Sequence, residues 1–283
     1  ERNNTLLRLL RARAPGAVVA EVGAGTGIWS LAAAAMGARH VYAIEPSPLH
    51  RTISELVTLN GLSEKITVVP AHIEATTPPP SGADLIFSEL LNVDPFAEEI
   101  LSAMDAAARW LAPGGLLAPS RLTLYAALIT DREPADERDA ALAQLRAVAR
   151  ETGLRLGPLD DVLRSPGPYC YAAPEVTLLG PPAVVCALPL GQGAVPPLEQ
   201  TLTLRSDRGG AAAGVAVWFE ADYGEGRVMS NGPGRAGHWG VFVCGWPHPQ
   251  PVSAGGSVTV SVEIADGSVV AVPQRMQSGL LSP

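Results

Sequence analysis

The chain has 283 residues, of which 47% are hydrophobic and 17% are charged, a balance typical of a folded globular protein long enough for two domains. Its formal net charge of -8 disfavours nucleic acid as a partner, because a phosphate backbone is bound by clustered lysine and arginine, and it leaves room for a cationic partner. No apolar stretch reaches the ~18 residues of a membrane-spanning helix, so no membrane partner is expected.

The first 119 residues alternate short apolar runs with helical patterns, as βαβ units do. Strands are predicted at 18–22, 41–45, 66–74 and 83–89, and helices at 28–38 and 50–61. Gly37 and Gly61 stand where these two helices should end. The pattern predicts an α/β fold with a parallel, doubly wound sheet in a first domain, residues 1–119.

After Pro119 the pattern changes to alternating strands separated by glycine and proline clusters. These strands are predicted at 122–129, 201–205, 214–221, 238–245 and 257–264. They indicate an antiparallel β-barrel or β-sandwich as a second domain, residues 120–283. A helix at 136–153 interrupts this domain, with Leu142, Leu145 and Ala149 on one face, inside an insertion at about 131–164.

Three cysteines, Cys170, Cys186 and Cys244, are widely spaced and form no Cys-x-x-Cys pair. Neither a disulfide framework nor a metal site is predicted from this spacing. Small buried side chains in a reducing compartment are the simplest interpretation, so we expect a cytoplasmic protein, and a reactive thiol is the less favoured alternative. Because the chain begins at Glu1 rather than Met, we also expect residues upstream.

The segment EVGAGTG follows the first predicted strand and opens the first helix. Its glycines permit a sharp turn and let a ligand approach backbone amides at a helix N-terminus. A dinucleotide fingerprint needs glycine or alanine where the chain has Ile28, and no lysine of a phosphate-binding loop follows. Glu45 ends the second strand about 20 residues on, where an acid can bind ribose hydroxyls. The loop therefore fits a nucleoside-bearing cofactor without a pyrophosphate better than NAD.

Two acids flank a short apolar loop in FSELLNVDPFAEE, residues 87–99. Glu89 ends the fourth predicted strand, and Glu98 follows the loop. Taken alone, the pair is compatible with solvated surface, an acid and base pair, a metal site or a clamp for a cation.

The stretch VxEVGAGTGxWSLxAAxxGAxHVYAIE, residues 19–45, resembles the class I S-adenosylmethionine-dependent methyltransferases, and among them the protein arginine methyltransferase family. This resemblance implies a Rossmann-like methyltransferase domain followed by a β-barrel domain, with S-adenosyl-L-methionine as the cofactor. In the family, the loop glycines hold the methionine part, the acid matching Glu45 binds ribose, and the acid matching Glu74 lies beside adenine. The cofactor-binding residues implied in this way are Arg2, Glu21, Gly23, Gly25, Gly27, Glu45, Ile73 and Glu74.

FSELLNVDPFAEE is similar to the double-E loop of the family, which begins Ser-Glu after the fourth strand and closes with a second Glu. The match falls on Ser88, Glu89 and Glu98. It implies that the two acids are catalytic residues that grip an arginine guanidinium, and that Ser88 contributes to substrate binding. The chemistry agrees, because arginine presents a planar fork of donors, stays protonated, and is best held by carboxylates.

Residues 229–246, MSNGPGRAGHWGVFVCGW, are similar to the other active-site loop of the family, whose core is Thr-His-Trp. Gly237 replaces the threonine here, while His238 remains as a catalytic candidate and Trp239 as a substrate-binding candidate. A single histidine is more often structural, but beside the double-E loop a role in the site is favoured. The family pairs this histidine with an acid on an N-terminal helix, which we expect upstream of Glu1.

The resemblance implies transfer of a methyl group to an arginine guanidinium nitrogen of a protein or peptide. A methyltransferase for a small guanidine or a natural product is the alternative, and a non-catalytic cofactor-binding scaffold is a third possibility, although a scaffold has no need for three converging polar residues. The helix at 136–153 lies where the family inserts a dimerisation arm, so we expect a homodimer. Leu90 and Leu91 replace a frequent Met-Gly, so the number of methyl groups transferred is not predicted.

Overall fold

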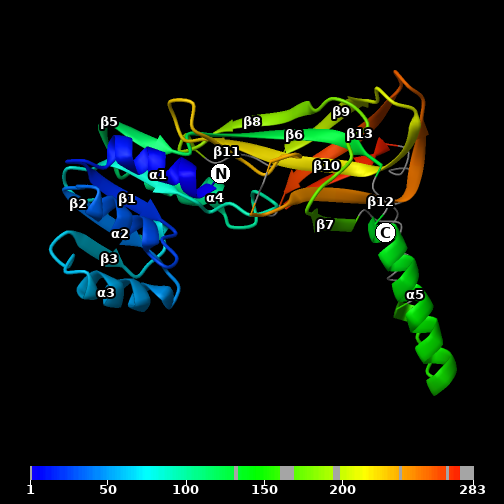
Figure 1. Ribbon diagram of the computed structural model, residues 1–283, viewed down its shortest axis with the longest axis horizontal. Coiled ribbons are helices and arrows are strands. Elements are labelled where there is room, and N and C mark those ends of the chain that lie inside the picture. The colour runs from blue at the N-terminus through cyan, green and yellow to red at the C-terminus, as the bar shows by residue number, and fades with distance from the viewer. Residues whose placement is uncertain are drawn as a thin grey trace.

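The structure is a computed structural model that describes residues 2–130, 133–159, 169–193, 198–235, 238–265 and 268–274 (Figure 1). It places a parallel sheet with its helices at one end and antiparallel sheets beside it (Figure 1). Within these ranges, every helix is too short or too polar to cross a lipid bilayer.

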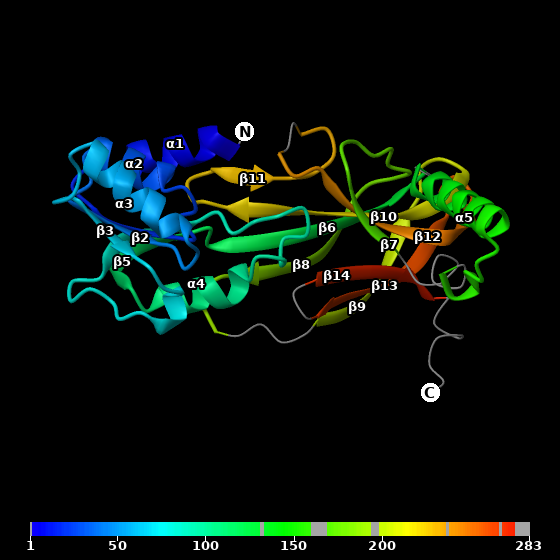
Figure 2. The same cartoon turned by 90° about the horizontal axis from the view of Figure 1, so that it is seen from below.

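The parallel sheet has the strand order β3-β2-β1-β4-β5. Its strands are β1 (Val18–Val22), β2 (His40–Ile44), β3 (Ile66–Val69), β4 (Ala83–Ser88) and β5 (Leu111–Ala118). The helices α1 (Arg2–Arg13), α2 (Ile28–Ala35) and α3 (Leu49–Leu59) lie on one face, and α4 (Ile100–Ala108) lies on the other (Figure 2). All five residues of β1 are buried, as expected for a central strand covered on both faces.

Local sequence explains where these elements end. Gly37 and Gly61 have φ of 96° and 66°, and their N–H groups donate to carbonyls in the last turns of α2 and α3, so both predicted stops are confirmed. The predicted third strand was too long. It ends at Val69 because Pro70 has no N–H for the sheet, and the chain then forms a 3-10 turn, η1 (Ile73–Ala75).

Two antiparallel sheets follow β5. The larger has the order β7-β12-β10-β6-β8, with β11 paired to the end of β10, and the smaller has the order β14-β13-β9. Their strands are β6 (Arg121–Ile129), β7 (Tyr169–Ala173), β8 (Ala183–Pro189), β9 (Leu198–Arg205), β10 (Gly210–Asp222), β11 (Val228–Ser230), β12 (Val241–Val252), β13 (Ser257–Ala265) and β14 (Ser268–Pro273). An α/β unit with a parallel sheet, followed by an antiparallel β unit, confirms the predicted fold class.

The two antiparallel sheets share one core. Leu124 of β6, Val217 of β10, Leu204 of β9 and Val262 of β13 are all buried in the same cluster. The predicted strand at 238–245 begins only at Val241, because the preceding glycine has φ of 75°. Sequence patterning did not predict β7, β8, β11 or β14, which are short or lie at sheet edges.

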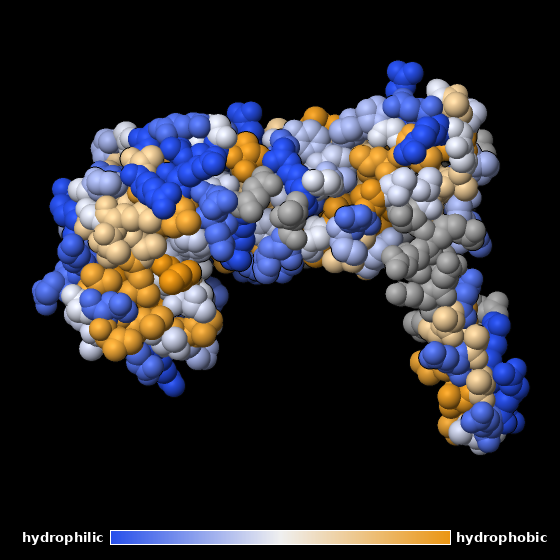
Figure 3. Space-filling model, in the orientation of Figure 1, coloured by the Kyte–Doolittle hydropathy of each residue, from blue (hydrophilic) through white to orange (hydrophobic). Residues whose placement is uncertain are grey.

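The predicted insertion forms α5 (Glu133–Thr152), which projects away from the antiparallel sheets (Figure 1). The helix was predicted over 136–153 and ends at Thr152, because Gly153 follows with φ of 72°. Leu142 is buried and Leu145 is half-buried, whereas Val148 is 47% exposed. Apolar side chains also reach the surface of the projecting arm (Figure 3). Part of the apolar face of this helix is therefore left uncovered by its own chain.

Candidate active site

Polar segments follow four neighbouring strands at the carboxyl edge of the parallel sheet, where open α/β sheets bind ligands. The glycine loop follows β1, Glu45 follows β2, η1 comes after β3, and Glu89 follows β4. The N-terminal helix brings Arg2 to Glu89, and the loop before β12 brings Trp239 near Arg2. Residues from both ends of the chain thus meet at this edge.

The glycine loop after β1 combines close packing with one open position. Gly23, Gly25 and Gly27 have φ of 73°, 54° and 77°, a region that favours glycine. A Cβ atom on Gly23 would lie 2.5 Å from Leu90, and one on Gly27 would lie 2.8 Å from Ile53. A Cβ atom on Gly25 would meet nothing within 4 Å. The outer glycines are therefore required for packing, whereas the backbone at Gly25 is open to a ligand.

Glu45 holds this loop in place. Its side chain is buried, with Oε2 accepting a hydrogen bond from the Gly25 N–H at 2.6 Å and Oε1 accepting one from the Ser47 N–H at 2.8 Å. A carboxylate has about four lone-pair positions, so it can accept further hydrogen bonds from hydroxyl groups. Glu45 can thus support the loop and bind a diol together.

Glu21 lies inside β1, beneath the glycine loop. It is 3% exposed and accepts a hydrogen bond from the Ser30 hydroxyl. The pKa of Glu21 is raised from 4.5 to about 8, chiefly by burial and also by the charges of Glu89 and Glu45, while hydrogen bonds from Ser30 partly offset the rise. At neutral pH the group is therefore mostly protonated, and a nearby positive charge would favour its ionised form.

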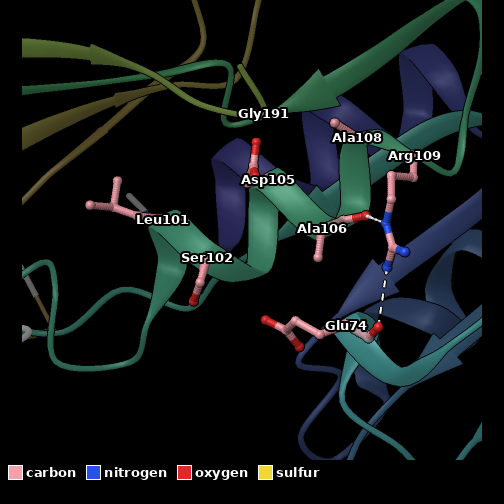
Figure 4. Close-up of a pocket in the computed structure, with 8 residues that line it drawn as sticks. All are labelled: Glu74, Leu101, Ser102, Asp105, Ala106, Ala108, Arg109 and Gly191. Carbon is pink, nitrogen blue, oxygen red and sulfur yellow. Dashed lines mark hydrogen bonds between the residues drawn. The ribbon is translucent and has the colours of Figure 1, made fainter. Parts of the chain in front are cut away.

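Ile73 and Glu74 form the turn after β3, facing α4. Arg109 fixes this turn, because its Nη2 donates to the carbonyl oxygen of Ile73 at 3.4 Å and to that of Glu74 at 3.3 Å. Figure 4 shows the bond to Glu74. The Glu74 carboxylate points into a cavity of about 840 Å³ between η1 and α4 (Figure 4). The side chain of Ile73 is buried. The turn therefore presents a carboxylate to a cavity on a fixed backbone.

A guanidinium already lies at the end of β4. Arg2 Nη2 forms an ion pair with Glu89 Oε2, and the Arg2 Cζ atom lies 6.0 Å from the centre of the Trp239 ring. The pKa of Glu89 is raised overall, and burial is the largest cause. The hydrogen bond and charge of Arg2 lower this pKa, and the charge of Glu98 raises it. The Nε atom of Arg2 is buried without a hydrogen-bond partner. Arg2 was predicted to bind the cofactor, and here it contacts the first acid of the double-E loop.

Glu98, the second acid of that loop, is exposed. Its Oε1 accepts a hydrogen bond from Asn92 Nδ2 at 2.9 Å, so the two ends of the loop are linked. Glu98 is close enough to Glu89 for its charge to affect the Glu89 pKa. The loop thus holds one carboxylate in the interior and one at its mouth.

Ser88 has no free hydroxyl for a ligand. It is 0% exposed, its Oγ donates to the Val22 carbonyl at 2.8 Å, and it accepts from the Leu90 N–H at 3.2 Å. Tyr223, which sequence reasoning did not single out, donates its hydroxyl proton to the Ser88 carbonyl at 2.7 Å. These contacts fix the start of the double-E loop against β1 and the end of β10. Ser88 therefore positions the loop, and its side chain does not face a ligand bound there.

Two further residues missed from the sequence fix the rest of the loop. Asp94 is buried and accepts hydrogen bonds from Ser268 Oγ at 2.7 Å and from the Phe96 N–H at 3.1 Å. Asn231 is 1% exposed, and its Nδ2 donates to the carbonyls of Val93 and Gly240, both at 3.1 Å. The only sequence signal for Asp94 and Asn231 was that each is a short polar residue in one of the two segments that resemble active-site loops of the family.

The loop before β12 places two rings at the site. Trp239 packs edge-on against Phe219, with ring centres 5.4 Å apart, and against His238, with ring centres 5.6 Å apart. The His238 side chain is exposed. Gly237 lies outside the described residues. Trp239 is therefore fixed by the β10 strand, whereas His238 is open to a partner.

Comparison with known proteins finds relatives in sequence and in fold. A family described as "Methyltransferase domain" matches residues 19–115. An arginine N(omega)-methyltransferase from Streptomyces achromogenes subsp. streptozoticus is 29% identical over 277 residues, which cover 94% of this chain and 74% of that protein. Protein arginine N-methyltransferase 8-B from Danio rerio is 39% identical over 120 residues, covering 42% of this chain and 29% of that relative.

The fold has a close counterpart in a Trypanosoma brucei PRMT1 enzyme-prozyme heterotetrameric complex with AdoHcy. That structure is 20% identical, has a TM-score of 0.77, and is matched over 94% of this chain and 86% of that chain. These findings support a divergent member of the protein arginine methyltransferase family. The predicted fold class and the predicted resemblance to this family are confirmed.

The roles of its site residues stay predictions. Arg2, Glu89 and Trp239 lie together, while Glu21 and Glu45 lie close enough to influence one another beneath the glycine loop. Glu74 lies across the α4 cavity. Within the described ranges, no group of three or more His, Cys, Asp or Glu residues is arranged to hold a metal ion.

Proposed function

We propose that this protein transfers a methyl group from S-adenosyl-L-methionine to a guanidinium nitrogen of arginine in a protein or peptide. The observation that carries the proposal is the position of Arg2, whose guanidinium is held by Glu89 near the Trp239 ring. A carboxylate and an indole suit a planar cation, because they offer charge-assisted hydrogen bonds and an electron-rich face. The net charge of -8 also favours a cationic substrate.

The residues at the sheet edge fit S-adenosyl-L-methionine. Gly25 leaves open backbone, Glu45 retains lone pairs for the ribose hydroxyls, and Glu74 borders a cavity that can take a base. A cation bound nearby would favour the ionised form of Glu21, whose pKa is raised to about 8, and ionised Glu21 would in turn attract that cation. The methyl donor is cationic. When bound, the donor supplies a methyl group on a positively charged sulfur.

Glu89 and Glu98 would then orient the acceptor. Arg2 contacts Oε2 of Glu89, which leaves Oε1 for an N–H of the substrate guanidinium, while Glu98 stands at the mouth of the site. Holding one nitrogen in line with the methyl group makes the reaction effectively intramolecular. The new N–C bond forms as the C–S bond breaks, and the nitrogen loses one proton. The products are methylarginine, the demethylated donor and a proton.

This proposal is tested by incubating the protein with isotope-labelled S-adenosyl-L-methionine and a panel of arginine-containing peptides. We expect label on arginine side chains, located by fragment mass spectrometry, and no label on matched peptides with lysine in place of arginine. Label confined to lysine, to a carboxylate or to no peptide and no small guanidine would contradict it.

One observation favours a second candidate function. The Streptomyces relative that aligns with 94% of this chain is named for arginine, without the word protein. A small guanidine such as free arginine is therefore the alternative acceptor. The same assay separates the two, because a higher kcat/KM for free arginine than for every peptide would favour the small-molecule acceptor.

The cofactor assignment predicts an effect at Glu45. Glu45→Ala should weaken donor binding by ~1.5 to 3 kcal/mol, the order expected when a hydrogen bond to a charged group is lost. Isothermal titration calorimetry measures this, with Glu55→Ala, an exposed acid on α3, as the matched control. Tighter binding of NAD than of S-adenosyl-L-methionine to the wild type would contradict the assignment.

We also propose a head-to-tail homodimer in which α5 packs on the methyltransferase domain of a second copy. The arm exposes Val148 and Leu154, at 47% and 58%, and the parallel-sheet unit exposes Ile28 and Leu59, at 56% and 81%. In a dimer, the exposed apolar surface on one part of a chain can be buried against the other exposed apolar surface on the second copy. A helix that packs only on its own chain is the alternative.

Light scattering at tens of micromolar tests the dimer. We expect a dimer for the wild type and a monomer for the double variant Val148→Glu/Leu154→Glu. The control variant Val184→Glu, at an exposed apolar position on β8, should remain a dimer. A wild-type monomer would instead favour the helix packing on its own chain.

Two coarser assignments accompany this function. A division at Pro119 is supported by the change from the parallel β5, which ends at Ala118, to the antiparallel β6, which begins at Arg121. We assign the donor to residues 1–119 and the acceptor to their junction with residues 120–283. The three cysteines are free thiols, which suits a reducing compartment such as the cytoplasm.

A further inference from the structure

Two cysteines that are 74 residues apart in the sequence lie opposite each other in the larger antiparallel sheet. Cys170 belongs to β7 and Cys244 to β12, and the two are direct register partners in the antiparallel ladder. Their sulfur atoms are 3.7 Å apart. The sequence spacing gave no sign of this pair, because the fold alone brings the two strands together.

The backbone between them suits a covalent bond. Directly opposite residues of an antiparallel pair have Cα atoms about 4.5 to 5.5 Å apart, within the ~4.4 to 6.8 Å that a disulfide spans. Strand β7 lies at the edge of the sheet and pairs only with β12 in the described part of the chain, so small shifts of β7 disturb no second ladder. Side-chain rotation at the two positions can therefore bring the sulfurs into bonding distance.

The two thiols have complementary environments. Cys170 is exposed, so a dissolved oxidant can reach it, whereas Cys244 is buried beneath it. The hydrogen bond between the two thiols lowers the pKa of Cys170, against opposing effects of burial and Asp94. Burial raises the pKa of the third thiol, Cys186, to about 11. A reachable thiol beside a second thiol is the usual arrangement of a reversibly oxidised pair, and Cys186 lacks these features.

We propose that Cys170 and Cys244 form an oxidative modification site that a hydroperoxide closes to an intramolecular disulfide. The Cys170 thiolate attacks one peroxide oxygen, the O–O bond breaks, and a sulfenic acid and water form when the oxidant is hydrogen peroxide. The Cys244 sulfur then attacks the Cys170 sulfur, the S–O bond breaks, and a second water leaves. In total two thiols lose two hydrogens and one peroxide is reduced to two waters.

The bond would connect β7 to the strand that follows the His238–Trp239 loop. Val241, at the start of β12, is the register partner of Ala173, at the end of β7. The Ala173 carbonyl also lies so near Gly240 that a Cβ atom there would be 2.8 Å from it. Oxidation would therefore tie the edge strand to the segment that leads out of the candidate active site.

Mass spectrometry of the full chain tests the proposal. The reduced protein is treated with hydrogen peroxide in small molar excess, alkylated under denaturing conditions, and measured intact. We expect loss of two hydrogens with one alkylated cysteine left, and full reversal by dithiothreitol. Digestion with trypsin and a glutamate-specific protease should give a Cys170–Cys244 cross-linked peptide, because cleavage after Glu175 separates Cys170 from Cys186.

Matched variants decide the outcome. Cys186→Ser should form the disulfide at the wild-type rate, while Cys170→Ser and Cys244→Ala should not form it. If Cys244→Ala fails to fold, alkylation rates of the native wild type supply a second measurement, with Cys170 expected to react at least about tenfold faster than Cys186. Any of three results would overturn the proposal: three alkylated cysteines after peroxide treatment, a cross-link that includes Cys186, or a disulfide found only between two chains.

Discussion

Replacing Glu89 or Glu98 with glutamine should slow methyl transfer by roughly 30- to 1000-fold, which corresponds to about 2 to 4 kcal/mol of lost transition-state stabilisation. Glutamine keeps the shape of the side chain and removes the charge that a guanidinium needs. Glu89 is largely shielded from water and already holds a guanidinium, so its charge is weakly screened. Donor affinity should change little, because the glycine loop and Glu45 provide most of that contact.

Single-turnover methylation of the best acceptor, with donor affinity measured in parallel, separates these effects. Glu99→Gln is a matched control, because Glu99 is exposed and adjoins Glu98. Its rate should stay within about twofold of the wild type, since surface substitutions usually change energies by less than ~0.5 kcal/mol. Wild-type rates in both Glu89→Gln and Glu98→Gln would refute the clamp. An equal loss of donor affinity would instead make these acids cofactor ligands.

Glu21→Gln should remove a pH dependence from the stability of the protein without donor. Between pH 4.5 and pH 8.5, the unfolding free energy of the variant should rise by about 2 to 5 kcal/mol relative to that of the wild type. The folded-state pKa of Glu21 is raised to about 8 from an ordinary 4.5, chiefly by burial. Between these values the unfolded chain releases a proton that the folded chain keeps, so wild-type stability falls as pH rises from about 4.5 through 8. Glutamine cannot ionise and removes this fall.

Urea unfolding from pH 4.5 to 9 measures this difference. Glu64→Gln, at an exposed acid outside the site, should follow the wild-type curve throughout. Parallel curves for Glu21→Gln and the wild type would show that Glu21 has an ordinary pKa. Bound donor should reduce the pH effect, because its positive charge favours ionised Glu21.

The strands and glycines that form the donor side of the site could be predicted because each is a local feature. β1 begins and ends at the predicted residues, Gly37 and Gly61 stop their helices, and Glu45 follows β2. Each depends on the few residues around it. The error at the third strand was also local, since Pro70 was sufficient to predict the earlier end.

The acceptor side could be predicted only as a set of residue types. The pairing of Arg2 with Glu89 joins residues 87 positions apart, and the bond from Tyr223 to Ser88 joins residues 135 positions apart. Periodicity carries no information on such contacts. Ser88 shows the result: its place in a loop similar to that of the family suggested substrate contact, whereas the fold commits its hydroxyl to Val22 and Leu90.

The amide of Asn231 makes the two loops of the acceptor side a single mechanical unit. It accepts from the Phe219 N–H at 2.9 Å and donates to one carbonyl in each loop, so its three hydrogen bonds join the double-E loop, β10 and the segment after Trp239. Neither loop can shift without breaking a hydrogen bond to the buried Asn231 amide. A change of acceptor specificity therefore has to alter both loops together. If one loop were replaced with that of a relative, its side chains would take up their positions only if the carbonyl groups of Val93 and Gly240 stayed in place.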